Sequence, residues 1–457
     1  MTEKLIQDYI WENKDNLNKL FVEVEFPNEI VKNKPWEITP SEVIFNTVIA
    51  NYKRTWSMVK DMFIFGCEVP LKKNYESTIR ADFLGIFNGT NGVAIIELKK
   101  SAQTERQAFT ELLGYGNHIH TIFAPMSKID IAYILISPMK ERIVRESLLN
   151  NIINEKNTTF ALIPSWENDD VTTLKLTPWI PTLIEINNLM NASFAENNFD
   201  LYKITWDGLP GEWSPEEEGD NPDQFMIERM NIVSAYAAQI MEAKGIHGFV
   251  YCSQAYSETR SQGHLINSIV VVGLNPYKAT KNRKLLKDNP TATAKEVSTA
   301  DVSIFNMLDI IPELKNKYYD EKDTTNYFSD LSMIWSDGIA SVGFDIVKTL
   351  TKSLDKKSIE TSYGGFVWDS FQHNFQEDIM THNFDIRPTG LIRELYWEYS
   401  KLDYDYIRVN GCDEHPICFG GDDIPNYMVD IMTNQYYFRD FIRRLFNPFH
   451  EIDFDEA

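Results

Sequence analysis

Long apolar runs and cysteine are both scarce in this chain. No segment of the 457 residues comes near the roughly 20 consecutive apolar residues of a membrane-spanning helix, and the opening Met1–Lys4 lacks the apolar centre of a signal peptide. Cysteine occurs only at positions 67, 252, 412 and 418, which is typical of a reducing compartment rather than of a disulfide-rich secreted protein. These absences predict a cytoplasmic protein without a membrane span.

An excess of positive charge is missing as well. The formal net charge is −23, of which residues 1–190 carry −4 and the remainder −19. Nucleic-acid-binding domains are usually basic, so the C-terminal part is better suited to regulation, self-association or protein contacts. The hydrophobic content of 43% indicates a folded globular protein, and the length predicts two or three domains.

Two consecutive apolar segments, residues 79–87 and 93–100, carry acids and a lysine at regular spacing. Asn88–Gly92 between them is typical of a turn, so the sequence predicts a β-hairpin. Because side chains alternate along a strand, Glu97 and Lys99 should lie on one face, with Ile96 and Leu98 on the core face. Asp82 on the first strand would then lie beside Glu97. Two neighbouring carboxylates can share a hard divalent cation, with an ammonium group within reach of the same phosphate.

An alternative reading is an amphipathic hairpin with a solvated, charged face. Two details favour a site instead. Asp is unfavourable in a strand, yet Asp82 lies in a run made largely of Ile, Phe and Leu. Glu97 follows four apolar residues, which is the pattern of a strand that is buried on both faces. A buried acid requires a partner, and a metal ion is one of the few good ones.

The segment after the hairpin has the spacing of a helix. Gln107, Glu111 and Tyr115 recur every four residues and would form one polar face, while Phe109, Leu112 and Leu113 can pack behind it. Another apolar run at 129–137 is suited to a central strand, and Pro138 ends it. Strand, strand, helix, strand predicts a mixed α/β domain.

An acid on one strand, E-x-K on the next and a following helix resemble the pattern of the PD-(D/E)XK nuclease superfamily. The opening helix, the Arg-x-Asp strand and the Glu-Leu-Lys strand look most like the branch of Shedu-type anti-phage nucleases and NucS-like endonucleases. The resemblance covers about residues 1–190. It implies a restriction-endonuclease-like mixed sheet flanked by helices, in which Asp82, Glu97 and the carbonyl of Leu98 hold Mg²⁺ or Mn²⁺ and Lys99 helps to activate water.

The same resemblance suggests further site residues. Many members have a glutamate on the first helix, for which Glu3 is the candidate and Glu12 the rival, although Glu3 equally suits helix capping after Thr2. Members also have a Q-x-x-x-Y helix that approaches nucleic acid. Gln107 and Tyr115 match this motif loosely, because they are eight residues apart. Phosphate contacts are expected from the cations near the site, each of which could equally be a solvated surface charge: Arg80, Lys100 and Arg106.

The remaining sequence suggests two further parts. Residues 26–65 interrupt the nuclease-like pattern with an aromatic-rich insertion, in which Trp36, Trp56 and Phe63 could stack on bases but more often would be core. Residues 191–224 have the composition of an acidic linker. Residues 225–457 predict a second α/β or α+β domain, with helices at 224–243, 344–354 and 389–402 and strands at 248–252 and 266–274.

The sequence therefore predicts a metal-dependent nuclease domain joined to an acidic regulatory or assembly domain. DNA is the expected substrate, more so than RNA, and the resemblance implies restriction or anti-phage defence in bacteria as the setting. A protein partner could supply the missing positive surface, and the acidic part could serve binding of that partner or self-association. The competing hypothesis is a non-catalytic or partner-activated scaffold that retains the nuclease fold, although an intact Asp82, Glu97 and Lys99 argue against a decayed site.

Overall fold

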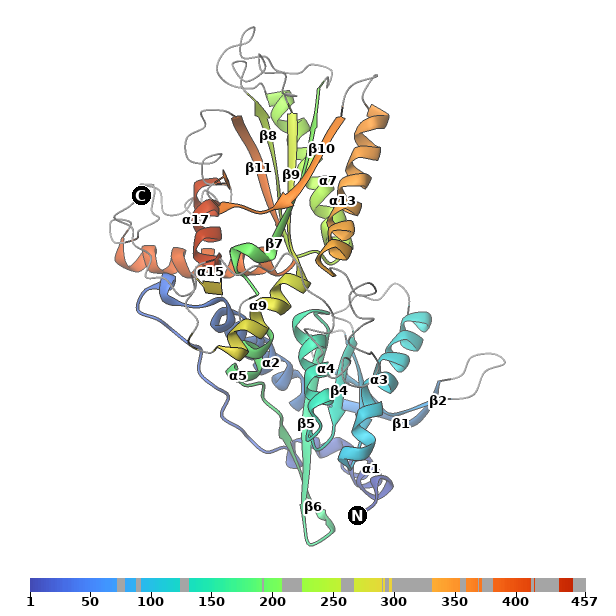
Figure 1. Ribbon diagram of the computed structural model, residues 1–457. Helices are drawn as coiled ribbons and strands as arrows, with labels where there is room; N and C mark the ends of the chain where they lie inside the picture. The colour runs from blue at the N-terminus through green and yellow to red at the C-terminus, as the bar shows by residue number, and fades with distance from the viewer. Residues whose placement is uncertain are drawn as a thin grey trace, which may run out of the picture. The chain divides into compact units, whose positions relative to one another are not determined.

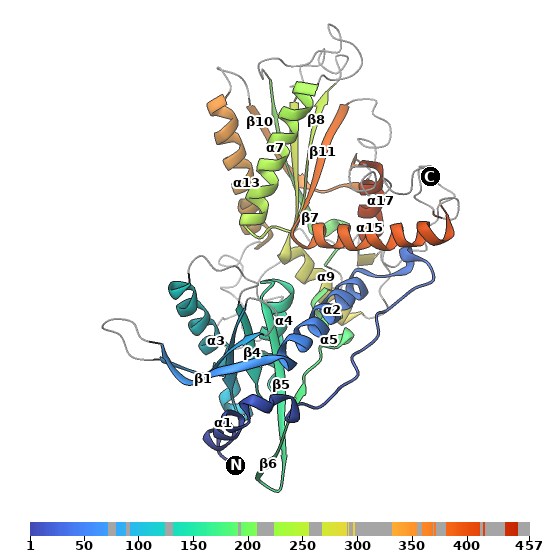
Figure 2. The same cartoon turned by 180° about the vertical axis from the view of Figure 1, so that it is seen from behind.

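The structure is a computed structural model in which the chain divides into two compact units, residues 1–30 with 44–186 and residues 31–43 with 187–457 (Figures 1 and 2). The residues that it describes are 1–71, 79–87, 92–123, 131–190, 193–207, 224–255, 267–289, 291, 296–297, 331–353, 359–368, 370–371, 381–411, 415 and 435–446. Each unit is described by itself below.

The first unit is built around a six-stranded mixed sheet. Its strand order follows the chain: β1 (Met62–Leu71), β2 (Ile79–Phe87), β3 (Val93–Leu98), β4 (Ile131–Ile136), β5 (Thr158–Glu167) and β6 (Asp170–Pro178). The central pairs β3–β4 and β4–β5 are parallel, and the other neighbours are antiparallel. The hairpin and the central strand at 131–136 confirm the sequence prediction, whereas the hairpin's turn, residues 88–91, lies outside the described residues.

Helices cover both faces of this sheet, which explains why β3 and β4 are almost uninterrupted apolar runs. Side chains from α1 (Glu3–Glu12), the short helix η1 (Lys14–Lys19) and α2 (Pro40–Lys60) form one core with the sheet, and Ile96 and Leu98 belong to it as predicted. On the opposite face, α3 (Ala102–Ile122) packs on β3 and β4, and α4 (Arg142–Ile153) packs on β5. The short helix α5 (Leu183–Met190) follows β6.

Most of the aromatic insertion is structural. The ring of Trp56 stacks on Phe160 of β5 at 5.7 Å, and Tyr52 stacks on the same ring at 4.4 Å. The hydroxyl of Tyr52 accepts a hydrogen bond from the backbone N–H of Ala161 at 3.0 Å. Phe63 on β1 is 39% exposed. Trp56 is therefore core, as expected for irregularly spaced aromatics.

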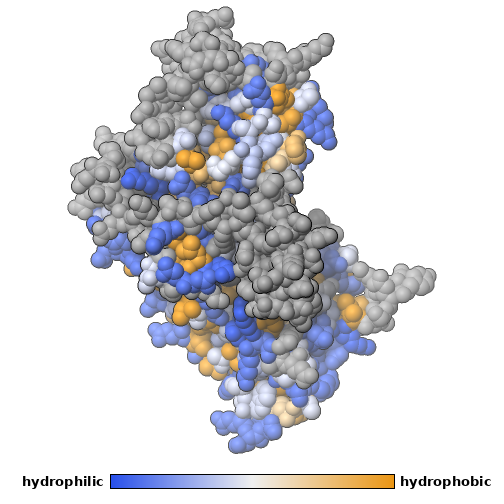
Figure 3. Space-filling view, viewed as in Figure 1, coloured by the Kyte–Doolittle hydropathy of each residue, from blue (hydrophilic) through white to orange (hydrophobic). Residues whose placement is uncertain are grey.

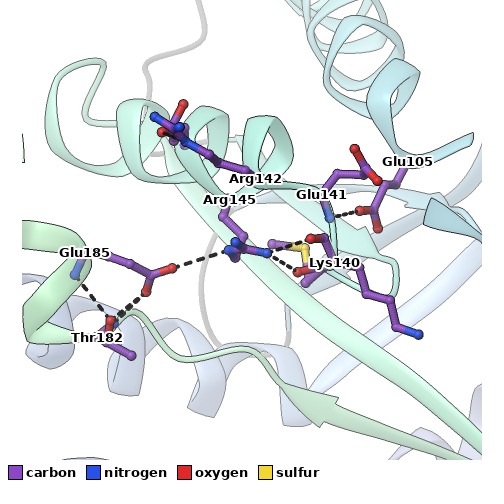
Figure 4. Close-up of polar contacts among 9 residues, drawn as sticks. Glu105, Lys140, Glu141, Arg142, Arg145, Thr182 and Glu185 are labelled. Carbon is purple, nitrogen blue, oxygen red and sulfur yellow. Dashed lines mark hydrogen bonds and ion pairs between the residues drawn. The ribbon is translucent and has the colours of Figure 1, made fainter. Parts of the chain in front are cut away.

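A polar network fixes the chain after β4 and the first turn of α3 (Figure 4). Glu105 of α3 is fully buried and accepts hydrogen bonds from the hydroxyl of Ser137 and the N–H of Glu141, at 3.2 and 2.5 Å. Arg145 donates to the carbonyls of Met139 and Lys140 and pairs with Glu185. Glu105 is thus a buried acid with a structural role, and it holds the start of α3 against β4.

The second unit contains a five-stranded antiparallel sheet with the order β10-β7-β9-β8-β11. The bounds are β7 (Phe199–Trp206), β8 (Gly248–Ala255), β9 (Asn267–Leu274), β10 (Ile359–Gly365) and β11 (Thr381–Thr389). Apart from the helix Pro276–Asp288 that follows β9, the described elements β7, α7 (Gln224–Ala243), β8, β9, α13 (Leu331–Ser353) and β10 follow a β-α-β-β-α-β order, to which β11 adds an edge strand. This is the α+β alternative of the prediction.

The two faces of the second sheet have different cores. Val250, Cys252 and Val271 face α7 and α13, whereas Phe249 meets the rings of Phe371 and Phe438. The second face is adjoined by α15 (Gly390–Asn410) and α17 (Gln435–Phe446), which are joined through the buried pair Asp403–Arg444 at 2.9 Å. The remaining described helices are η2 (Pro35–Glu37), η4 (Glu196–Asn198) and α9 (Pro276–Asp288).

The predicted boundaries differ from the observed units in two places. Residues 199–206 fall within the expected linker 191–224, yet they form β7, which pairs with β9 and β10 inside the second sheet. Residues 208–223 lie outside the described residues. Residues 31–43 belong to the second unit, where the carbonyl of Ile38 accepts a 2.8 Å hydrogen bond from the hydroxyl of Tyr399. The predicted linker 191–224 is therefore too long, because it includes the residues of β7.

No described helix combines the length and apolar composition that a membrane crossing requires. On the face drawn in Figure 3, hydrophilic residues cover much of the described surface and the hydrophobic residues form scattered small patches.

Candidate functional site

The two acids predicted on the hairpin come together where β2 and β3 stop pairing. The last paired residues are Phe83 and Ile96, so Asp82 and Glu97 are the next step of the same register and share a face of the sheet. The carboxylate of Asp82 accepts a 2.8 Å hydrogen bond from the backbone N–H of Leu98 through Oδ2. The side chain of Asp82 on β2 thus fixes the backbone at the end of β3.

A glutamine of α1 completes the fixation of Asp82. Nε2 of Gln7 donates a 3.1 Å hydrogen bond to Oδ1 of Asp82, and Gln7 is only 4% exposed. Sequence reasoning missed this residue. The signal that could have found it is its place beside Ile6 and one turn before Ile10, on the side of the helix that faces the core.

Lys99 lies between two glutamates. Its Nζ contacts Oε1 of Glu97 and lies 2.6 Å from Oε2 of Glu111 on α3. Glu97 is 2% exposed and Lys99 is 9% exposed, so this contact is largely removed from water. The sequence predicts Glu111 only as part of the polar face of the helix, whereas the structure brings it to the site together with Glu97 and Lys99.

The electrostatics of the two strand acids are strongly perturbed. Burial raises the pKa of Asp82 to about 6, although the Leu98 N–H and Lys99 act in the opposite direction. Burial, the charge of Asp82 and the contact with Glu111 raise the pKa of Glu97 to about 9. Oε2 of Glu97 is buried and has no hydrogen-bond partner among the described residues. The positive charge near the two carboxyl groups therefore does not offset the cost of their burial and mutual repulsion.

Lys99 and Tyr115 respond to the same cluster. Burial by itself lowers the pKa of Lys99, but the contacts with Glu111 and Glu97 outweigh it, and the pKa is raised. Burial raises the pKa of the Tyr115 hydroxyl, and the charges of Glu97 and Glu111 add to the effect. Tyr115 is 7% exposed and lies one turn after Glu111 on α3. The structure thus brings Tyr115 near the acids.

Glu3, rather than Glu12, is close to the site. The carboxylate of Glu3 accepts a 3.0 Å hydrogen bond from the N–H of Lys100, and its charge contributes to the raised pKa of Asp82. Glu12 is exposed at the end of α1. The side chain of Lys100 is exposed and donates to the carbonyl of Met1.

The other predicted contacts stay at the periphery. Gln107 is exposed, one turn before Glu111 on α3. Arg80 is also exposed and donates to the carbonyl of Glu68 at 3.2 Å. The side chain of Arg106 lies outside the described residues. Neither Gln107 nor Arg80 is joined to Asp82 or Glu97 by a hydrogen bond among the described residues.

Whether the site suits a divalent cation depends on its oxygens. Among the described residues there is no ready group of three His, Cys, Asp or Glu side chains that could hold a metal ion. The donor set at the strand ends is instead two carboxylates and a main-chain carbonyl, all oxygen, as Mg²⁺ and Mn²⁺ prefer. The buried, unpartnered oxygen of Glu97 and the excess of carboxyl groups fit a hard cation there.

Comparison with known proteins adds no family to this geometry: no family model, no curated protein and no solved structure matches the chain.

Proposed function

We propose that the first unit is a Mg²⁺- or Mn²⁺-dependent nuclease that hydrolyses phosphodiester bonds of DNA. The observation that carries the proposal is the arrangement of two acids on adjacent strands, the half-buried Asp82 and the buried Glu97, with Lys99 in contact with the second acid. A pair of carboxyl groups with raised pKa values beside a lysine is costly to bury, and such groups cluster at functional sites.

The arrangement of elements supports the same proposal. An antiparallel hairpin leads into the parallel pairs β3–β4 and β4–β5, α3 packs on the strand that carries Glu97, and Gln7 of α1 donates a hydrogen bond to Asp82. These features agree with a restriction-endonuclease-like sheet of the PD-(D/E)XK superfamily, in its Shedu-type and NucS-like branch. Restriction or anti-phage defence in the bacterial cytoplasm is the corresponding biological role.

The chain's own residues would divide the work as follows. Asp82, Glu97 and the carbonyl of Leu98 would hold the cation, which supplies Lewis acidity and lowers the pKa of bound water. Gln7 and the N–H of Leu98 orient Asp82. The ammonium group of Lys99 would donate hydrogen bonds to the attacking water or the scissile phosphate. Lys100, Arg80 and Arg106 would contact backbone phosphates, which fixes position without reading sequence.

The test is cleavage of plasmid, linear duplex, single-stranded DNA and RNA, each with Mg²⁺, with Mn²⁺ and with chelator. We expect DNA cleavage that requires the cation and falls at least about 100-fold in Lys99→Met and Asp82→Asn, because general acid–base and electrostatic groups contribute that much. Lys140→Ala is the matched control, since its side chain points away from the polar network in Figure 4 and is exposed.

A second candidate is a partner-activated enzyme or a binding scaffold. Two observations favour it: the net charge of −23 disfavours unaided binding of DNA, and Lys99 is engaged by two carboxylates. The acidic second unit would then serve regulation, self-association or partner binding. Cation binding without cleavage of any substrate, in wild type and Lys99→Met alike, would favour this candidate and reject the autonomous nuclease.

A further inference from the structure

Glu111 occupies a place that the proposed reaction does not yet explain. Its Oε2 is 2.6 Å from Nζ of Lys99, and the same Nζ contacts Glu97. Lys99 therefore shares one ammonium group between a strand acid proposed to hold a cation and a helix acid that is not. We infer that Glu111 is a positioning residue, which keeps Lys99 at the site when a divalent cation engages Glu97. The inference rests on the proposed function.

The physical need for such a residue follows from charge. A cation on Glu97 and the ammonium of Lys99 repel one another, and both compete for the same carboxylate. Lys99 is largely buried, so solvent screens this repulsion poorly. A second carboxylate already in contact with Nζ offsets the repulsion and gives Lys99 a partner when Glu97 is taken.

The packing of α3 fixes the backbone position of Glu111. Ala108 and Leu112, on either side of it in the helix, are fully buried, and Tyr115 is nearly so. The first turn of α3 is held by Glu105 through Ser137 and Glu141. The carboxyl of Glu111 is therefore presented to Lys99 by a fixed helix. An ordinary surface ion pair between flexible, solvated side chains contributes little stabilisation. The contact between Glu111 and Lys99 differs because the helix is fixed and Lys99 is largely buried.

Calorimetric titration of the full-length protein with Mn²⁺ alone tests the inference without relying on cleavage. We expect Glu111→Gln to weaken Mn²⁺ binding about tenfold, the usual effect of losing a residue that supports a metal ligand. Glu68→Gln is the matched control. It also removes one negative charge that acts on Asp82, but its carboxyl pairs with Lys4 and not with Lys99. It should weaken binding less than about twofold.

The decisive comparison repeats the substitution in Lys99→Met. If Glu111 acts through Lys99, Glu111→Gln should lose its effect in that background and match Glu68→Gln. An undiminished tenfold loss there would make Glu111 a ligand and overturn the inference, as would equal effects of Glu111→Gln and Glu68→Gln in the wild-type background. Absence of Mn²⁺ binding by the wild type would overturn the proposed function and the inference with it.

Discussion

The carboxyl group of Glu97 is held between an apolar strand, a second acid and a lysine. Its pKa lies near 9 in the folded chain because burial and the charge of Asp82 oppose ionisation more than Lys99 favours it. At neutral pH the folded state thus keeps a proton that the unfolded state releases. The stability that this proton contributes is fully present below the ordinary pKa of about 4.5 and is lost as the pH rises through about 9.

The pH dependence of stability should therefore change in Glu97→Gln, whose amide is neutral at every pH. We expect the thermal midpoint of the wild type to fall, relative to that of Glu97→Gln, between about pH 5 and about pH 9 in the presence of chelator. Differential scanning calorimetry of both variants across this range measures the effect. Mg²⁺ should reduce the wild-type decline, since a cation compensates the ionised carboxylate.

Glu146→Gln provides the control for this series. Glu146 is exposed on α4 and pairs with Arg142 one turn away, so its replacement removes a charge without touching the site. Its midpoint should run parallel to that of the wild type. Parallel curves for Glu97→Gln as well would show that the Glu97 carboxyl titrates normally, and the proposed electrostatics of the site would be wrong.

The sequence predicts which site residues lie side by side only where they are close together along the chain. Asp82, Glu97 and Lys99 share one hairpin, so strand alternation and register suffice to bring Asp82 and Glu97 together and to place Lys99 beside Glu97. Gln7 could not be assigned to Asp82 in this way, because its hydrogen bond joins residues 75 apart along the chain. Glu111 lay on the predicted polar face, but nothing in a helical period says which strand residue that face will meet.

At the scale of elements, α2 is joined to the sheet by an aromatic stack. Trp56→Ala should cost about 3–5 kcal/mol of unfolding free energy, because the cavity beside Phe160 is fully enclosed. Tyr52→Phe should cost about 1–3 kcal/mol, since the buried N–H of Ala161 loses its acceptor. Urea denaturation measures both values.

The exposed position Ile143 on α4 provides the comparison, because Ile143→Ala should change the unfolding free energy by less than about 0.5 kcal/mol. A Trp56→Ala effect no larger than this would show that α2 contributes little to the core. The sequence indicated that such aromatics would be core. It could not indicate that residues 40–60 form a helix against β5, because the pairing partner Phe160 is about a hundred residues further on.

The same limit explains β7. Residues 202–206 alternate apolar and polar side chains, but a breaker-rich acidic stretch follows at once, and the composition of that stretch dominated the prediction of a linker. Its strand character depends on β9 and β10, which pair with it from distant parts of the sequence. By contrast, α7, β8, β9 and α15 have clear periods of their own and lie where the sequence predicted them.

For the whole molecule, the membership of residues 31–43 in the second unit makes a specific prediction. Trp36 contacts the rings of Tyr406 and His415 at 5.3 and 5.1 Å. Trp36→Ala should destabilise the second unit by about 1–3 kcal/mol, through lost packing. Hydrogen exchange measured by mass spectrometry should then accelerate in α15 and stay unchanged in β3 and β4.

Trp36→Phe, which keeps a ring at this position, should restore most of the protection in α15. Equal acceleration in β3 and β4 would assign residues 31–43 to the first unit instead. Apart from residues 31–43, the second unit begins at Asn187, near the predicted end of the nuclease-like part at residue 190, although the compositional change lies in the breaker-rich stretch after residue 206. The excursion at 31–43 has no compositional signal, and only its distant contacts reveal it.

This excursion also constrains the order in which the protein can be completed during synthesis. The hydrogen bond between Ile38 and Tyr399 joins residues 361 apart, and at about 5–20 residues per second a ribosome needs about 20–70 s to travel between them. All strands of the first sheet will have been made long before. The first unit can therefore close while residues 31–43 remain unpaired with α15, and the nascent chain must leave that segment accessible until α15 has been made.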